Sequence, residues 1–197
     1  MPQTLPDLKL TQGQLLWALG HGREPDKLLK DQVRYLRQLG IPYQSKEKAP
    51  GSGNQIRYDF FDLVELGVAL AALARRFRPK DIVAVLTDDR EKFRQQVAEC
   101  WLDLPDGVFD AEWVKSRGRL KPFLENIAFV RLHDRRSENW GKLDLVWTGD
   151  EYPGAELLDP FERFEDGEIR VLLPLNVLMI PWVAWALEAP PIRTGPK

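Results

Sequence analysis

Two helical segments joined by a short turn with two glycines constrain the fold of this 197-residue chain more than any other feature. Thr11 can cap the first helix, which ends at Gly20 and Gly22. The second helix can start at Pro25, a favourable first-turn residue, and ends before Gly40 and Pro42. The stripe positions of this helix recur at spacings of three and four, at Leu28, Leu29, Gln32, Val33 and Leu36. The N-terminal end of the chain therefore predicts a helix-turn-helix.

The segment from 43 to 58, YQSKEKAPGSGNQIRY, has no helical period. Turn-forming residues lie at its centre, and lysines and an arginine surround them. This composition predicts a two-stranded hairpin with a basic tip, commonly called a wing. Asp59 or Asp62 can then cap a third helix that extends to about Phe77, and residues 80–86 are short and amphipathic. We expect residues 1–87 to form one winged-helix domain.

Charge is distributed unevenly along the chain. The net charge is -2, but residues 1–96 hold 16 Lys/Arg against 12 Asp/Glu, whereas residues 97–197 hold 12 against 18. Within residues 23–57 the count is 8 Lys/Arg against 4 Asp/Glu. A polyanion would be attracted to this N-terminal region.

Residues 88–105 are expected to form a linker or a dimerisation helix. Apolar residues alternate there at intervals of four, three and four, which is a heptad seam of about two heptads. Such a seam can pair helices across a dimer, or it can pack onto its own domain, and the pattern leaves both open. The candidate dimerisation residues are Phe93, Val97, Cys100 and Leu104.

Beyond Pro105 the sequence changes character. Segments 129–133, 142–147 and 169–173 have the composition of strands, so we predict a small α+β domain over residues 106–189 and a flexible tail at 190–197. The expected fold class of the whole chain is α+β. The uncharged run from Val171 to Leu187 contains Pro174 and Pro181, which favours a buried strand followed by a core helix over a membrane span.

Few residues are suited to catalysis or to metal binding. Cys100 is the one cysteine, and His21 and His133 are the only histidines. We therefore expect no enzyme activity, no cofactor and no metal site, with Cys100 buried for structural reasons. The lone cysteine and the absence of a signal-peptide pattern favour a cytoplasmic protein.

Three motifs in order resemble the MerR family of bacterial transcription regulators. VRYLRQLGI at 33–41, IRYDFFDLVEL at 56–66 and FRPKDIVAVL at 77–86 correspond to the LRYYE-x-x-GL, YRxY and F-S-x-E-I-x-x-L stretches of that family. The resemblance covers roughly residues 10–95. Leu36 and Ile56 replace family tyrosines, and there are extra residues before the VRY motif.

The resemblance implies a transcription regulator that binds double-stranded DNA as a homodimer, with a recognition helix in the major groove, and the C-terminal domain would serve dimerisation, effector sensing or partner contact. Cations spaced 3, 4 and 3 share one face of the second helix. Arg57 resembles the family's wing arginine that contacts phosphate. The candidate DNA-binding residues are Lys27, Lys30, Arg34, Tyr35 and Arg37 on the helix, and Lys46, Lys48, Asn54, Arg57 and Tyr58 in or beside the wing.

Three alternatives remain open at this level. The cations can be an ordinary solvated helix face, and the two tyrosines can be core aromatics. A winged helix can serve an architectural or recombination accessory protein, or it can dock another protein.

Overall fold

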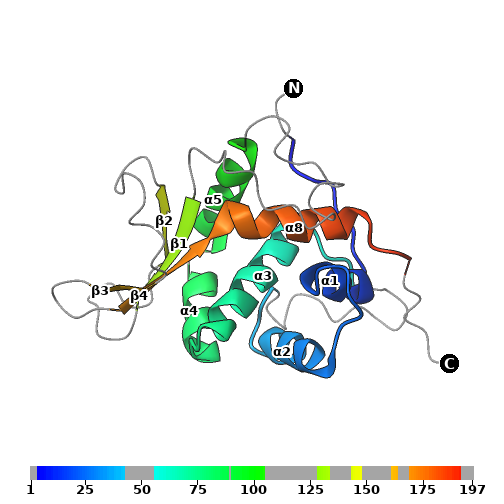
Figure 1. Ribbon diagram of the computed structural model, residues 1–197, viewed down its shortest axis with the longest axis horizontal. Helices are drawn as coiled ribbons and strands as arrows, with labels where there is room; N and C mark the ends of the chain where they lie inside the picture. The colour runs from blue at the N-terminus through cyan, green and yellow to red at the C-terminus, as the bar shows by residue number, and fades with distance from the viewer. Residues whose placement is uncertain are drawn as a thin grey trace.

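The structure is a computed structural model that describes residues 4–42, 56–88, 90–104, 128–133, 143–147, 161–163 and 169–191. The elements in chain order are α1 (Gln12–Leu19), α2 (Lys27–Gln38), α3 (Phe60–Ala74), α4 (Pro79–Asp88), α5 (Arg90–Leu102), β1 (Ala128–His133), β2 (Leu143–Trp147), β3 (Phe161–Arg163), β4 (Ile169–Pro174) and α8 (Leu175–Leu187) (Figure 1). Nearly all of the strands are described by their backbone alone.

The first three helices begin at side-chain caps. The Thr11 side chain accepts a hydrogen bond from the amide of Gln14, and Asp26 accepts one from the amide of Leu29 at 2.7 Å. Asp59 and Asp62 cap α3 reciprocally. Each cap satisfies an amide that has no partner within the helix, so these starting points are determined by local sequence. The two helices and the turn predicted for the N-terminal end are present, but α2 begins at Lys27 after its cap Asp26, not at Pro25 as predicted.

A single antiparallel bridge joins the residues before α1 to the residues before α3. The amide of Leu10 donates to the carbonyl of Tyr58 at 2.9 Å, and the amide of Tyr58 donates back at 2.9 Å. The bridge therefore holds the segment after residue 55 against the start of the helix-turn-helix. Residues 43–55, where the hairpin of the wing was predicted, lie outside the described residues.

The C-terminal helix α8 completes the core of the N-terminal helices. Figure 1 shows α8 crossing over α1 and α3. Its buried side chains cover more than half of the helix circumference, and Val177, Leu178, Pro181 and Trp185 on the remaining side are partly buried. A helix that is apolar all round needs this extensive cover. One hydrophobic cluster accordingly includes residues from Leu8 to Leu104 together with residues from Leu173 to Ala186.

Two tryptophans of α8 lie against glycines. A Cβ atom added at Gly67 of α3 would lie 2.5 Å from the ring of Trp182. A Cβ added at Gly22, in the turn between α1 and α2, would lie 2.3 Å from the ring of Trp185, and Gly22 also has a φ of +71°. Glycine is required at both positions, since the rings take the space that any side chain would need.

The prediction of an α+β fold is wrong. Where side chains are described, the body of the protein is all-helical and consists of six helices, α1 to α5 and α8. Residues 106–189 were predicted to form a separate small α+β domain. Instead α8 packs against α1, α3 and α5, and its apolar side chains belong to the same hydrophobic cluster as theirs.

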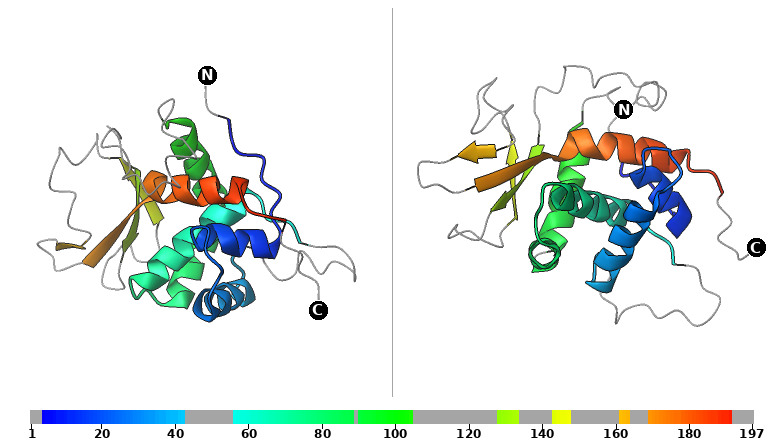
Figure 2. Two further views of the ribbon diagram at one scale, coloured as in Figure 1. Left: turned by 45° about the vertical axis from the view of Figure 1, so that its right-hand side comes forward. Right: turned by 60° about the horizontal axis from the view of Figure 1, so that its bottom comes forward.

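The strands pair in the order β2-β1-β4-β3, and all three pairings are antiparallel. Strand β4 ends at Pro174 and α8 begins at the next residue, so the sheet is joined to the helical body without a loop. Figure 2 shows the strands at one end of the molecule and α1 and α2 toward the other. The strand-to-helix transition expected in the uncharged run 171–187 is confirmed. Among the described helices, none has the length and hydropathy needed to cross a membrane.

The heptad seam of α5 packs onto the chain's own core. Phe93, Val97, Cys100 and Leu104 are all buried in the single hydrophobic cluster. Their assignment as dimerisation residues is therefore wrong, since a buried side chain has no surface left for a second subunit. Of the two alternatives that the pattern left open, the structure selects internal packing.

Cys100 is expected to be chemically inert in the folded protein. Burial, and secondarily the charge of Asp103, raise the pKa of its thiol to about 12, so almost no thiolate exists at neutral pH. A thiol-disulfide exchange reagent added at pH 8 should modify Cys100 no faster than the protein unfolds, and quickly in 6 M guanidinium chloride. Rapid stoichiometric labelling of the native protein would contradict this packing.

Candidate nucleic-acid interface

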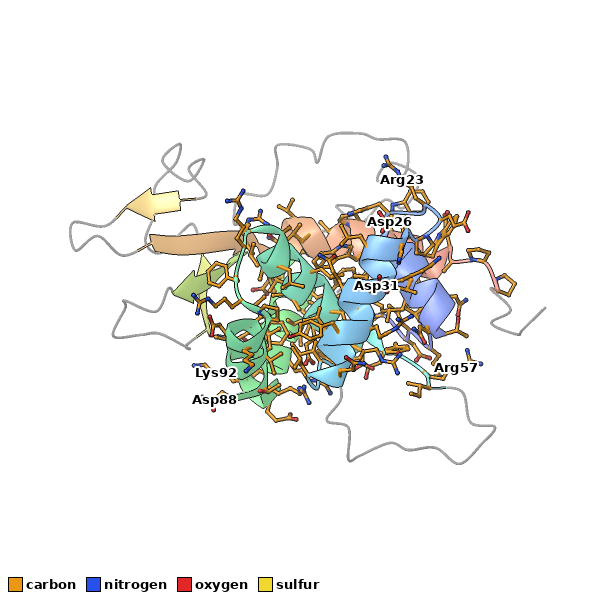
Figure 3. The ribbon with its side chains drawn as sticks, turned by 90° about the horizontal axis from the view of Figure 1, so that it is seen from below. Arg23, Asp26, Asp31, Arg57, Asp88 and Lys92 are labelled. Atoms are coloured by element: carbon orange, nitrogen blue, oxygen red, sulfur yellow. The ribbon has the colours of Figure 1, made fainter. Side chains whose placement is uncertain are left out.

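Helix α2 lies at the edge of the body and is anchored by few side chains. Val33 and Leu36 are buried, and they hold the helix against the core. Figure 3 views the molecule from below, with α2 toward the viewer and Asp26 and Asp31 along it. Since Val33, Leu36 and the partly buried Leu29 all lie on one side of the helix, the opposite side of α2 faces solvent.

Cations form one edge of this exposed surface. Lys27, Lys30 and Arg34 are exposed, and among the described residues neither lysine has an acidic partner within ion-pair distance. Arg34 lies 3.5 Å from Asp31 in an ion pair that is exposed on both sides. An exposed pair of this kind contributes little free energy, so a phosphate could displace Asp31 at small cost. We call Lys27, Lys30 and Arg34 the cationic edge of α2.

Acidic residues reduce the charge of the region without removing its excess. Between residues 23 and 42 there are five Lys/Arg and three Asp/Glu. One of the acids, Asp26, is engaged as the cap of α2. The region is therefore moderately basic.

The end of α2 contacts the segment that follows residue 55. The guanidinium carbon of Arg37 lies 5.7 Å from the ring centroid of Tyr58, within the range of a cation–π interaction. Arg37 is half-buried, whereas Arg57 is exposed, and Figure 3 labels Arg57 at the edge of the helical body. Arg57 is thus held close to the last turns of α2 by its neighbour Tyr58.

The assignment of Tyr58 as a DNA-contacting residue is wrong. Its side chain is 1% exposed and belongs to the core, and its backbone forms the bridge to Leu10. Burial raises the pKa of its hydroxyl, although Arg37 acts in the opposite direction. Tyr35, by contrast, is 44% exposed on α2. Of the two tyrosines considered from the sequence, one is a core aromatic and one remains on the surface.

The structure brings part of the predicted site together. Lys27, Lys30, Arg34 and Tyr35 lie on the exposed side of α2, with Arg37 and Arg57 next to its C-terminal end. Lys46, Lys48 and Asn54 lie outside the described residues. Among the described residues, no group of three or more His, Cys, Asp or Glu side chains is placed to hold a metal ion.

A buried charge network behind α2 was missed at the sequence level. Glu65 of α3 is buried, and its Oε1 accepts a hydrogen bond from Nη2 of Arg90 at 2.9 Å. The same Nη2 donates to the carbonyl oxygen of Gly40 at 2.9 Å, just after α2 ends. Arg94 lies 3.3 Å from Asp62 and 3.9 Å from Glu65. The signal was a single glutamate inside the apolar run LVELGVAL, which requires a buried cation.

Arg90 links the candidate recognition helix to the core. It connects the backbone at the C-terminal end of α2 with a buried carboxylate of α3, so the position of α2 depends on a residue of α5. Burial raises the pKa of Glu65 to about 7 even though Arg90 and Arg94 both lower it. The network therefore contains a group that titrates near neutral pH.

Comparisons with known proteins give no match: no family model, no curated protein and no solved structure is significantly similar to this chain. The function must be inferred from the chain's own residues.

Proposed function

We propose that this protein is a DNA-binding transcription regulator of MerR-like winged-helix type, with α2 as its recognition helix. The cationic edge of α2 supports this most directly, because three cations stand exposed on a helix that is anchored from behind by Val33, Leu36 and the partly buried Leu29. A helix held in this way can enter the major groove without exposing the core.

Two further observations support the proposal. The bridge between Leu10 and Tyr58 occurs where the base of a wing would meet the strand before the first helix. The Arg37–Tyr58 contact keeps the exposed Arg57 close to α2, where it could bind the phosphate next to the groove. In this proposal Lys27, Lys30 and Arg34 approach bases or phosphates, while Lys46, Lys48 and Asn54 contact the backbone or the minor groove.

The proposal retains a homodimer, because one recognition helix and one wing make few phosphate contacts. The α5 seam does not provide the dimer interface, so another surface must do so. An effector or a protein partner bound beyond residue 105 remains part of the proposal. We infer a cytoplasmic location from the target, since bacterial DNA lies in that compartment.

Replacing Lys30 and Arg34 by Ala tests this function. Each substitution is expected to weaken binding to a selected DNA site about tenfold, and removal of one phosphate contact should reduce the slope of log K against log salt by about one. Fluorescence anisotropy at several salt concentrations measures both quantities. Lys80→Ala removes an exposed cation of α4 and serves as the matched control with unchanged affinity.

Two results would count against the proposal. If the wild-type protein shows no salt-dependent affinity for any DNA, a protein-docking role becomes the better explanation. If Lys30→Ala/Arg34→Ala keeps full affinity with an intact fold, the DNA footprint lies elsewhere. Binding without sequence preference would instead favour an architectural or recombination accessory role.

A further inference from the structure

A leucine of α2 is exposed where the sequence pattern placed it in the core. Leu28 belongs to the stripe predicted to face the core, yet it is 64% exposed, whereas its neighbour Leu29 packs against the hydrophobic cluster. The anchor of α2 is centred on Val33 and Leu36, so Leu28 lies to one side of the buried stripe. An aliphatic side chain left in water at this position gains free energy from any apolar contact that covers it.

Leu28 and Tyr35 form a second edge of the exposed surface. They are seven residues apart, so they differ by about 20° around the helix and by about 10 Å along it. Each residue advances by about 100° around the helix, so Asp31 falls between this pair and the cationic edge on the circumference of α2. The exposed surface of α2 thus has a cationic edge and an apolar edge that run side by side.

The neighbouring charges determine what kind of partner fits the apolar edge. A polyanion complements Lys27, Lys30 and Arg34, and a partner that meets the cationic edge must also lie next to Leu28. Within the major groove of DNA, the apolar group that a leucine can contact is the 5-methyl group of thymine. Leu28 is the second residue of α2, and the first residues of a recognition helix are those that reach base edges.

We infer that Leu28 is a specificity-determining residue that contacts a thymine methyl group in the DNA site. This inference rests on the proposed function and adds the class of base that the helix recognises. Because consecutive base pairs rise by about 3.4 Å, Tyr35 would stand about three base pairs away from this thymine if the helix follows the groove. The cationic edge would supply affinity and the apolar edge would supply part of the sequence preference.

Removing single methyl groups from the DNA tests the inference. The preferred site is first selected from a random duplex library with the wild-type protein, and it is then synthesised with deoxyuridine in place of each thymine in turn. One position is expected to lose about fourfold in affinity, the effect of burying one methyl group. Leu28→Ala should bind the thymine site more weakly than the wild type does, and it should bind the thymine and deoxyuridine sites equally at that position.

Leu28→Met and Leu102→Ala are the control variants. Leu28→Met retains an apolar side chain and should keep the preference for thymine. Leu102→Ala removes an exposed leucine of α5 and should leave affinity and preference unchanged. Thermal unfolding of each variant checks the fold, and Leu28→Ala should melt as the wild type does because the side chain is largely exposed.

The outcomes separate this inference from the function on which it rests. If binding depends on salt, Lys30 and Arg34 but every deoxyuridine site binds as tightly as the thymine site, the role of Leu28 is refuted and the regulator stands. If Leu28→Ala still discriminates deoxyuridine from thymine, another residue contacts the methyl group and the inference fails. Absence of any DNA binding would refute both.

Discussion

Gly67→Ala is expected to lower the free energy of unfolding by about 2 to 3 kcal/mol, although alanine is the better helix former by about 1 kcal/mol. The new Cβ would lie 2.5 Å from the ring of Trp182, and both residues are buried. Neither the backbone of α3 nor the indole ring can move freely in a packed interior, so α3 and α8 must separate. Urea unfolding followed by circular dichroism measures the loss.

The double variant Gly67→Ala/Trp182→Ala distinguishes this clash from a general effect. Trp182→Ala alone should cost about 3 to 5 kcal/mol through the cavity it leaves. In the double variant the methyl group introduced on α3 meets no ring, so the double variant should be clearly more stable than the sum of the single effects. Additive losses would mean that α3 and α8 do not approach one another at these residues.

Arg90→Met should destabilise the protein by about 3 kcal/mol at pH 8, because it leaves the buried carboxylate of Glu65 with Arg94 alone at 3.9 Å. The loss should be smaller at pH 6, where a protonated Glu65 needs no cation. A part on the order of 1 kcal/mol should remain at both pH values, because the hydrogen bond to Gly40 is also removed. Urea unfolding at the two pH values measures each part.

The wild-type protein should lose stability as the pH rises toward neutrality, because of Glu65. Its pKa is about 7 in the folded protein and 4.5 in the absence of burial, so the folded state binds the proton more tightly. The contribution is complete below pH 4.5 and is lost as the pH rises through 7, with a total on the order of 3 kcal/mol. Glu65→Gln should flatten this part of the pH profile.

The double variant Glu65→Gln/Arg90→Met is the control for both experiments. Removing the carboxylate and its cation together should restore much of the stability that Arg90→Met loses at pH 8. Equal destabilisation by Arg90→Met at pH 6 and pH 8 would show that Arg90 acts through the Gly40 carbonyl alone. Because that carbonyl follows α2, Arg90→Met is also expected to weaken DNA binding in the proposed function.

The positions of the first helices could be predicted from the sequence because their signals are local. The side chains of Thr11 and Asp59 cap their helices by accepting hydrogen bonds from amides three residues further along the chain. Glycines follow α1 and α2 within the next turn. Each capping side chain and the amide that it binds lie within a few residues of one another, so a short stretch of sequence contains both. The shared edge of the exposed cations of α2 could also be predicted locally, since their spacing along the helix is enough to put them on one side.

The residues that were misassigned depend on contacts between distant segments. Spacing shows that Leu28 and Leu29 are near the apolar side of α2, but only the position of the neighbouring helices decides that Leu29 is partly buried and Leu28 exposed. Tyr58 becomes a core residue through its bridge to Leu10. The α5 seam is covered by the same chain, which a heptad pattern cannot distinguish from a partner.

The amino-acid sequence by itself determined that three helices form near the N-terminus, where α1 and α3 are capped, that α8 would be buried, and which cations share an edge, because helical period and capping act within a few residues. Only the tertiary structure decided that α8 fills the core of the helix-turn-helix and that Arg90 joins Glu65 to the end of α2. Those contacts join residues 25 or more positions apart, and the free energy that selects them comes from covering apolar surface and pairing buried charge. The local sequence shows that an apolar helix needs cover and that a buried charge needs a counter-ion, but it does not show which distant residues provide them.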